Sequence, residues 1–246
     1  HGTSRRQRQM CIRDSQRAVN IPGNLVATTA SQQNGVITLG SGSDIVVAGN
    51  LTAKEGGNIN IEGDFLSFGG EVDVSGTNAG AINLNSSGEI ALGGTLNASS
   101  TGNDGGDINI KSQYKIVQSH SSEINSSGNT NGGNILLSAP NIMSSGSVSA
   151  KGNQQGGYID IESEGYIRLL SSKIDVTGNT QGGLVRIGGE FQGNNNLTRT
   201  EEQQDVFVDR WGERRSLTNA KTVLVSDGSR IDISSSNGKA GTAIIW

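Results

Sequence analysis

The chain has 246 residues, a formal net charge of −4, 37 glycines and a single cysteine. One cysteine excludes a disulfide framework, and no apolar run approaches the roughly 20 residues of a membrane helix, so no membrane span is predicted. The sequence has no basic stripe interleaved with aromatic residues, which argues against nucleic acid as a partner.

Residues 1–15 differ from the rest of the chain, because they hold four arginines and the sole cysteine and show no alternation. They allow three readings: a basic targeting segment, a natural disordered arm or a non-native peptide. No apolar region follows them, which excludes a signal peptide. The run 8–15 (RQMCIRDS) resembles a translated sequencing adapter at the edge of an assembled fragment, the chain does not begin with Met, and it stops abruptly at Trp246. We therefore interpret 1–15 as non-native or disordered and 16–246 as the folded domain.

From residue 35 onward the chain repeats a unit in which a glycine precedes a short alternating segment. Seven copies follow one another at intervals of 22 to 27 residues, and an eighth comes 58 residues later. Self-similarity at such a period indicates a solenoid. The anchor glycines are Gly35, Gly57, Gly80, Gly106, Gly133, Gly157, Gly183 and Gly241.

Apolar residues alternate after each anchor glycine, which is the period of a strand and not of a helix. The second and fourth positions are apolar and are predicted to point into the core, as in Ile59 and Ile61 of one copy. The intervening position is mostly polar and is predicted to face water, with Leu136 as the exception. Its polar members are Asn60, Asn83, Asn109, Asp160 and Arg186.

Two further strand-like pieces follow in each period, for example 64–68 and 71–74. Three short strands per period predict one coil of a parallel β-helix, with about eight coils stacked at roughly 4.8 Å. Parallel crossovers are overwhelmingly right-handed, so we expect a right-handed coil. A β-sandwich is the main rival, but it would not repeat a glycine-anchored unit at nearly constant spacing.

The bends between strands explain the high content of glycine, asparagine, aspartate and serine. These residues supply positive φ angles or bonds from side chain to backbone. The recurring corners end at Gly76, Gly128, Gly152 and Gly178.

A charged insertion at about 194–218 interrupts the repeat. Nine charged residues fall within 199–215, and the run 205–209 (DVFVD) alternates like a small strand. One reading is a solvated loop or hairpin packed beside the rod. The other is a recognition protrusion, in which a Trp flanked by Arg stacks on a sugar or protein partner. Its candidate recognition residues are Arg199, Asp205, Arg210, Trp211, Arg214 and Arg215.

Catalytic chemistry finds little support in the residues. Glycoside hydrolysis needs paired carboxylates at a fixed separation, whereas the acids here are scattered and are expected to be outward, solubilising groups. A lyase would need a basic residue beside an acid cluster, for which Asp160, Arg168 and Arg186 are the nearest candidates. Calcium-binding nonapeptides and His or Cys clusters are missing from the sequence, and His120 is expected to be solvated. We predict no catalytic residues, cofactor or metal.

The C-terminal third holds three distinctive segments in a fixed order: GGxxxIGGxxxG at 182–193, NAxTxxV at 219–225 and a glycine-led segment ending in Trp at 238–246. In this it resembles the filamentous-haemagglutinin-like exoproteins of Gram-negative bacteria, in which these segments recur in the same order. The resemblance covers about residues 20–246. It implies a right-handed β-helical rod exported by two-partner secretion through an outer-membrane transporter. The secretion domain of that family is not in this sequence, so export is an inference.

The resemblance implies adhesion and no defined reaction. We expect a secreted or surface-displayed adhesin segment, a rigid rod that presents binding elements to a host or neighbouring cell surface, a glycan or the extracellular matrix. Two alternatives remain open. One is a carbohydrate-active β-helix enzyme, either a polysaccharide lyase or a hydrolase, and the other is a structural spacer without a ligand.

Overall fold

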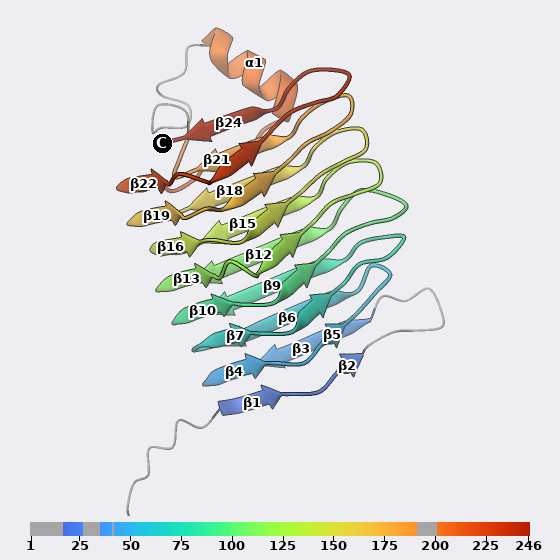
Figure 1. Cartoon of the computed structure of the whole chain (residues 1–246), viewed down its shortest axis with the longest axis vertical. Helices are drawn as coiled ribbons and strands as arrows, with labels where there is room; N and C mark the ends of the chain where they lie inside the picture. The colour runs from blue at the N-terminus through green and yellow to red at the C-terminus, as the bar shows by residue number, and fades with distance from the viewer. Residues whose placement is uncertain (1–16, 27–34, 41, 191–200) are drawn as a thin grey trace, which may run out of the picture.

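The computed structural model describes residues 17–26, 35–40, 42–190 and 201–246 (Figure 1). For residues 17, 18 and 201–205 it describes the backbone and not the side chains. Residues 1–15, which the sequence sets apart, lie outside the described residues. Within the described part, no helix is long and apolar enough to cross a membrane.

The chain winds into three parallel sheets of eight strands each, with every third strand in the same sheet. Sheet A contains β1 (Arg17–Ile21), β4 (Asp44–Val47), β7 (Leu66–Phe68), β10 (Glu89–Leu92), β13 (Lys115–Gln118), β16 (Asn141–Ser144), β19 (Tyr166–Leu169) and β22 (Thr222–Val225). Sheet B contains β2 (Leu25–Val26), β5 (Leu51–Thr52), β8 (Glu71–Asp73), β11 (Thr95–Asn97), β14 (Glu123–Asn125), β17 (Ser147–Ser149), β20 (Lys173–Asp175) and β23 (Arg230–Asp232). Sheet C contains β3 (Val36–Gly40), β6 (Asn58–Gly63), β9 (Ala81–Ser86), β12 (Asp107–Ser112), β15 (Asn134–Ser138), β18 (Tyr158–Glu162), β21 (Leu184–Ile187) and β24 (Thr242–Ile245).

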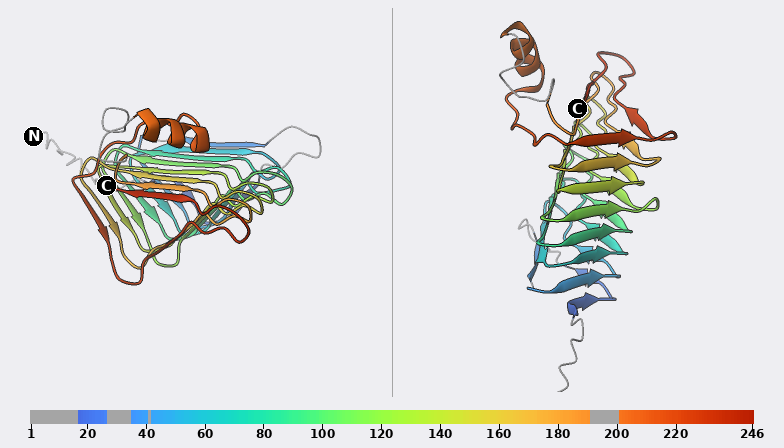
Figure 2. Two further views of the ribbon diagram at one scale, coloured as in Figure 1. Left: turned by 90° about the horizontal axis from the view of Figure 1, so that it is seen from above. Right: turned by 90° about the vertical axis from the view of Figure 1, so that its left-hand side faces the viewer.

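This architecture confirms the parallel β-helix with three strands per coil. Seen from above, the three sheets enclose a roughly triangular prism (Figure 2). The right-handed winding stays a prediction.

The predicted isoleucine and leucine columns fill the interior of the prism. On sheet C, Ile59, Ile82 and Ile108 occupy matching positions of successive strands, and all three are fully buried. The second column, which begins at Ile61 and Leu84, is buried in the same way. Each such side chain contributes about 1.5–3 kcal/mol of burial free energy, so the stacked columns hold the coils together.

The anchor glycines stack on one another where sheet C begins. A Cβ atom built on Gly133 would lie 2.0 Å from the carbonyl oxygen of Gly106, and one on Gly157 would lie 2.1 Å from that of Gly133. None of the described anchor glycines has a positive φ, and neither do the corner glycines such as Gly128. Positive φ does occur beside one anchor, at Gly56 (φ +82°) just before Gly57. At the anchor and corner glycines themselves the expectation of positive φ is wrong, and close approach of backbones is the reason for glycine there.

The expectation of bonds from side chain to backbone at the bends is confirmed after sheet B. The last residue of a sheet B strand accepts a hydrogen bond from the backbone N–H two residues later. This Asx turn occurs at Asp73, Asn97 and Asn125, with N···O distances of 2.9 to 3.1 Å. It recurs at Asp175 and Asp232, so one polar residue shapes the same bend in five coils.

The charged insertion separates β21 from β22, and it contains the helix α1 (Glu201–Trp211). The predicted small strand at 205–209 is wrong, because these residues lie within α1. Glutamates open the helix and Arg210 lies in its last turn, which matches the helix dipole. The helix ends at Gly212, whose φ is +70° and whose N–H donates to the carbonyl of Val208 at 2.8 Å.

Candidate functional site

The C-terminal end of the insertion, from Arg210 to Thr218, lies against the outer face of sheet C, near the strands closest to the C-terminus (Figure 2). Trp211, at the end of α1, fixes it there. Its indole Nε1–H donates to the Thr242 hydroxyl at 3.2 Å, and its ring meets that of Tyr158 edge-on at 6.1 Å. Only 4% of Trp211 is exposed, so the prediction that this ring stacks on a ligand is wrong. Trp211 instead attaches the insertion to the rod.

A fully buried arginine lies beneath the insertion. The Arg186 guanidinium donates to both carboxylate oxygens of Asp160, at 2.8 and 2.7 Å, and it also binds the Glu190 carboxylate. A further bond of 3.0 Å reaches the carbonyl of Arg215 in the insertion. Burial lowers the pKa of Arg186, but the two carboxylates outweigh that effect and raise it. The network is therefore a charged cluster whose buried members compensate one another.

A second contact fixes the insertion at the end of β18. One oxygen of the buried Glu162 carboxylate accepts bonds from the Arg215 guanidinium at 3.0 Å and from the Thr218 backbone N–H at 3.1 Å. Burial would raise the pKa of Glu162, but bonds from Arg215, Thr218 and Ser138 together hold it below its usual value. Glu162 is therefore bound as a carboxylate.

Asp160 and Arg186 occupy the outward positions of their strands, as the alternation predicts. The expectation that they face water is nevertheless wrong, because the insertion covers them and Asp160 is only 6% exposed. Arg168, the third candidate for lyase chemistry, lies on β19 of sheet A and stacks on Tyr166 at 4.5 Å. The structure thus does not bring the three candidates together.

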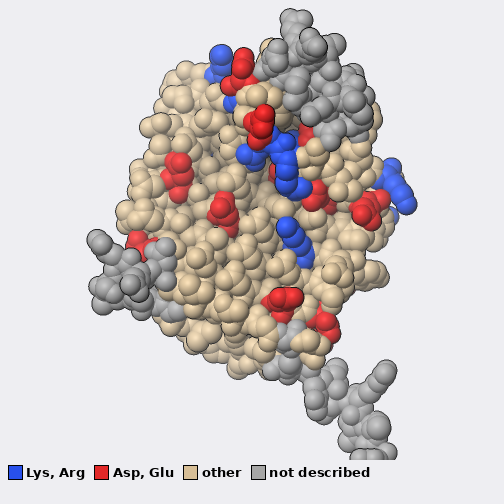
Figure 3. Space-filling model, turned by 180° about the vertical axis from the view of Figure 1, so that it is seen from behind, with Lys and Arg blue, Asp and Glu red and all other residues tan. Residues whose placement is uncertain are grey.

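A hollow of about 320 Å³ opens where the insertion ends on sheet C. The Arg214 guanidinium lies 3.9 Å from the ring centre of Tyr158 at this hollow, and the buried Nε of Arg214 has no hydrogen-bond partner among the described residues. Basic side chains gather beside the insertion on this face (Figure 3). The hollow is lined by Asn109, Asn134, Ile135, Leu136, Tyr158, Asp160, Glu213, Arg214 and Arg215.

The predicted recognition residues do not all lie at this hollow. Arg214 and Arg215 line the hollow, whereas Arg210 stacks on Trp211 at 4.7 Å and donates to the carbonyl of Ala240. Arg199 lies outside the described residues, and so does the side chain of Asp205, which belongs to α1.

Sequence reasoning missed the floor of this hollow, which sheet C supplies. Leu136 offered a signal, because it is apolar at a position that is polar in the copies on either side of it. Tyr158 offered another, since it places an aromatic ring where its register neighbour carries Asn134. Among the described residues, no group of three His, Cys, Asp or Glu side chains could hold a metal ion.

No protein-family model matches this chain, and searches of curated proteins and of solved structures gave no match. The function is therefore inferred from the fold and from the site.

Proposed function

We propose that this chain is a rigid segment of a secreted or surface-displayed adhesin-like exoprotein, and that its insertion is a recognition element. The observation that carries the proposal is the way the insertion is held. The buried Arg186 guanidinium donates to the Arg215 carbonyl, and the buried Glu162 carboxylate accepts bonds from the Arg215 guanidinium and the Thr218 N–H, which fixes the insertion to sheet C. Arg214 and Tyr158 line an open hollow beside these contacts.

The mechanism is mechanical. Each coil is hydrogen-bonded to the next through three parallel sheets, so the rod holds the hollow in one geometry. A pre-organised site loses little conformational entropy on binding, which favours affinity. The partner would be a host or neighbouring cell surface, a glycan or the extracellular matrix. The resemblance to two-partner secretion exoproteins adds an outer-membrane transporter as the export partner and the cell exterior as the location.

The contacts of the charged side chains favour ligand binding over catalysis. Both oxygens of Asp160 accept hydrogen bonds from Arg186, and Arg168 belongs to another sheet. A general acid or base must reach the reacting proton within hydrogen-bond distance. The side chains closest to lyase chemistry are thus occupied by structural contacts or lie apart.

An attachment assay tests this proposal. The full chain would be applied to cell monolayers, matrix proteins and glycan arrays, alongside Arg214→Ala and the control Lys173→Ala. Lys173 is exposed on β20 of sheet B, far from the insertion. We expect attachment to fall about tenfold for Arg214→Ala, the loss of one charged contact, and to stay unchanged for Lys173→Ala. Equal attachment by both variants would show that the insertion is not the recognition element. A lack of attachment by every form would favour a spacer without a ligand, and release of sugar products would favour an enzyme.

A further inference from the structure

We propose that the corner between sheets C and A binds a neutral, linear polysaccharide that lies along the rod. The proposal rests on the adhesive function proposed above and names a ligand class for it. It uses a surface separate from the hollow at Arg214.

Two hollows follow each other along this corner, with volumes of about 430 and 310 Å³. They share Ser112, Gln113 and Ser138, so they form one continuous channel, here called the corner groove. It runs from Gly42 at one end to Thr218 of the insertion at the other.

One row of side chains forms the wall of the corner groove. Its members are register neighbours at the ends of five successive strands of sheet C. Four steps at about 4.8 Å give the row a length of roughly 19 Å along the axis. The row consists of Glu62, Asn85, Lys111, Ser138 and Glu162.

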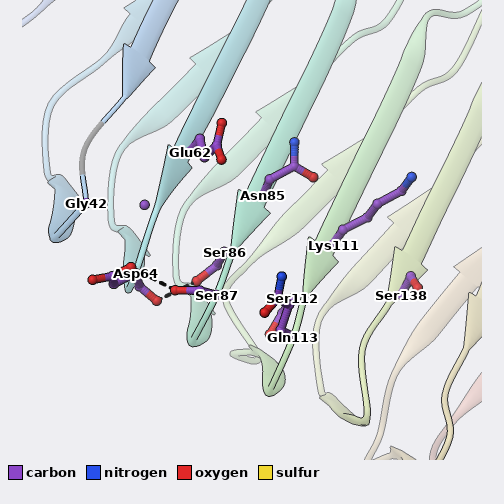
Figure 4. A pocket seen from close by; sticks show the side chains of 11 residues that line it. Gly42, Glu62, Asp64, Asn85, Ser86, Ser87, Lys111, Ser112, Gln113 and Ser138 are labelled. Carbon is purple, nitrogen blue, oxygen red and sulfur yellow. Dashed lines mark hydrogen bonds between the residues drawn. The ribbon is translucent and has the colours of Figure 1, made fainter.

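The first three members of this row have free hydrogen-bonding groups. Glu62, Asn85 and Lys111 are exposed, and within the described part of the chain their side chains have no hydrogen bond or ion pair. They stand side by side on neighbouring strands (Figure 4), where the bonds drawn involve Asp64 and the nearby serines instead.

The row two residues earlier on the same strands behaves differently. There, Asn83 donates to Asn60 at 2.9 Å and Asn109 donates to Asn83 at 3.0 Å. Those side-chain amides are hydrogen-bonded to one another from strand to strand. The first three members of the groove row therefore differ from that neighbouring row, because their donors and acceptors are not bonded to one another.

The chemistry of the groove selects an uncharged, hydroxyl-rich ligand. Amide, hydroxyl, ammonium and carboxylate groups together offer donors and acceptors at each step. Among the residues that line the groove, carboxylates outnumber the single cation Lys111. Glu62, Asp64 and Glu164 supply this surplus, while the charge of Glu162 is compensated by Arg215. Phosphate, sulfate or uronate chains would be repelled by this surplus.

A peptide strand is a poorer match. Interior strands of sheet C are paired on both sides, as β12 is with β9 and β15, so they offer no free edge for strand addition. Among the described residues, no aromatic side chain lines either hollow. A polymer with a regular repeat of hydroxyl groups matches the regular repeat of strand ends.

Affinity electrophoresis and calorimetry would test the proposal with the full chain. The probes are the neutral polymers mixed-linkage β-glucan, glucomannan and xylan, with alginate and heparin as anionic counterparts. We expect binding of at least one neutral polymer and none of the anionic ones. The double variant Asn85→Ala/Lys111→Ala should weaken that binding about tenfold or more, whereas Lys173→Ala should not change it.

Other results would overturn the groove. Preference for heparin or alginate would contradict the charge argument, and unchanged binding by the double variant would place the ligand elsewhere. If cells attach in an Arg214-dependent manner but no neutral polymer binds, the groove proposal fails and the adhesin proposal stands. Because Asn85 and Lys111 are exposed, circular dichroism should confirm that the double variant is folded.

Discussion

Single glycines set the distance between coils. The carbonyl oxygen of Gly106 occupies the space that a side chain on Gly133 would need. The added Cβ would also lie 2.2 Å from the Ser126 hydroxyl oxygen and 2.6 Å from the backbone carbonyl carbon of Gly105, so a backbone segment must shift to make room. Overpacking of this kind costs about 1–3 kcal/mol or more.

We therefore predict that Gly133→Ala lowers the free energy of unfolding by about 3 kcal/mol or prevents folding. Gly69→Ala is the matched control, because nothing lies within 4 Å of a Cβ built at Gly69. Urea denaturation followed by circular dichroism measures both. Equal stability of the two variants would contradict the close-approach explanation.

The anchor glycines also show what a sequence can and cannot predict at this scale. Their spacing and the alternation after them predicted the strands and the buried columns, because both follow from a period of two. The reason for glycine was misjudged, since steric conflict arises between residues 22 to 27 positions apart. A local rule for turns describes φ and ψ, and it contains nothing about the neighbouring coil.

At the scale of elements, the insertion depends on charges buried beneath it. Removing Arg186 would leave the Asp160 and Glu190 carboxylates buried without their cation, which costs about 3–5 kcal/mol. We predict a loss of this size for Arg186→Ala. Arg168→Ala, an exposed arginine at the outward position of β19, should change stability by no more than about 0.5 kcal/mol.

Chemical denaturation with urea would measure both losses. In a Trp246→Phe background, fluorescence of Trp211 reports whether the insertion stays docked, because Trp211 is then the only tryptophan. Acrylamide should quench it more strongly in Arg186→Ala. If Arg186→Ala is as stable as the parent and its Trp211 is as well protected from acrylamide, the buried network does not hold the insertion.

The contact at Glu162 predicts a dependence on pH. Its pKa is lowered in the folded protein by Arg215 and Thr218 despite burial. Such a carboxylate stabilises the fold fully above its unfolded pKa of about 4.3, and this stabilisation is lost as pH falls through the folded value. The gap in unfolding free energy between the parent and Glu162→Gln should thus be widest near neutral pH and shrink in acid.

Denaturation series between neutral and strongly acidic pH would measure that gap. Glu164→Gln serves as the control, since Glu164 is exposed and two residues away on the same segment. The difference in unfolding free energy between the parent and Glu164→Gln should stay small across the pH series. A Glu162→Gln gap that grows as pH falls would reverse the predicted sign and exclude the contact as its cause.

Part of this site could be predicted from the sequence. Asp160 and Arg186 hold the same position in consecutive copies, and they have opposite charges where other copies carry asparagine. That pairing indicates a bond between coils, but nothing local indicates that residues 211–218 cover it. The covering segment folds as a helix followed by an extended stretch, and its docking depends on contacts such as Trp211 with Thr242, 31 residues apart.

At the scale of the whole molecule, the rod is nearly one-dimensional. Each strand pairs only with the corresponding strands of the coils before and after it. Stability in such a solenoid is close to a sum of coil terms and neighbour contacts. No single core requires all coils at once, so the number of coils should be adjustable.

Deletion of one whole period tests this consequence. Removing residues 107–133 takes out β12, β13 and β14 and joins Gly106 to Asn134, so that β9 would pair with β15 as β12 does now. The insertion and the strands that carry it stay intact. We predict a folded protein that is shorter by about 4.8 Å in small-angle scattering, with a urea m-value lower by roughly one eighth.

Deletion of residues 113–125 is the control, because it removes β13 and β14 but leaves β12 in place. The strands that follow would then meet the wrong sheet, and the apolar columns would no longer align. This shorter deletion should therefore be the more damaging one and yield an unfolded or aggregated chain. If both deletions unfold the protein, stability is not a sum over coils, and the rod must instead fold around contacts that span its length.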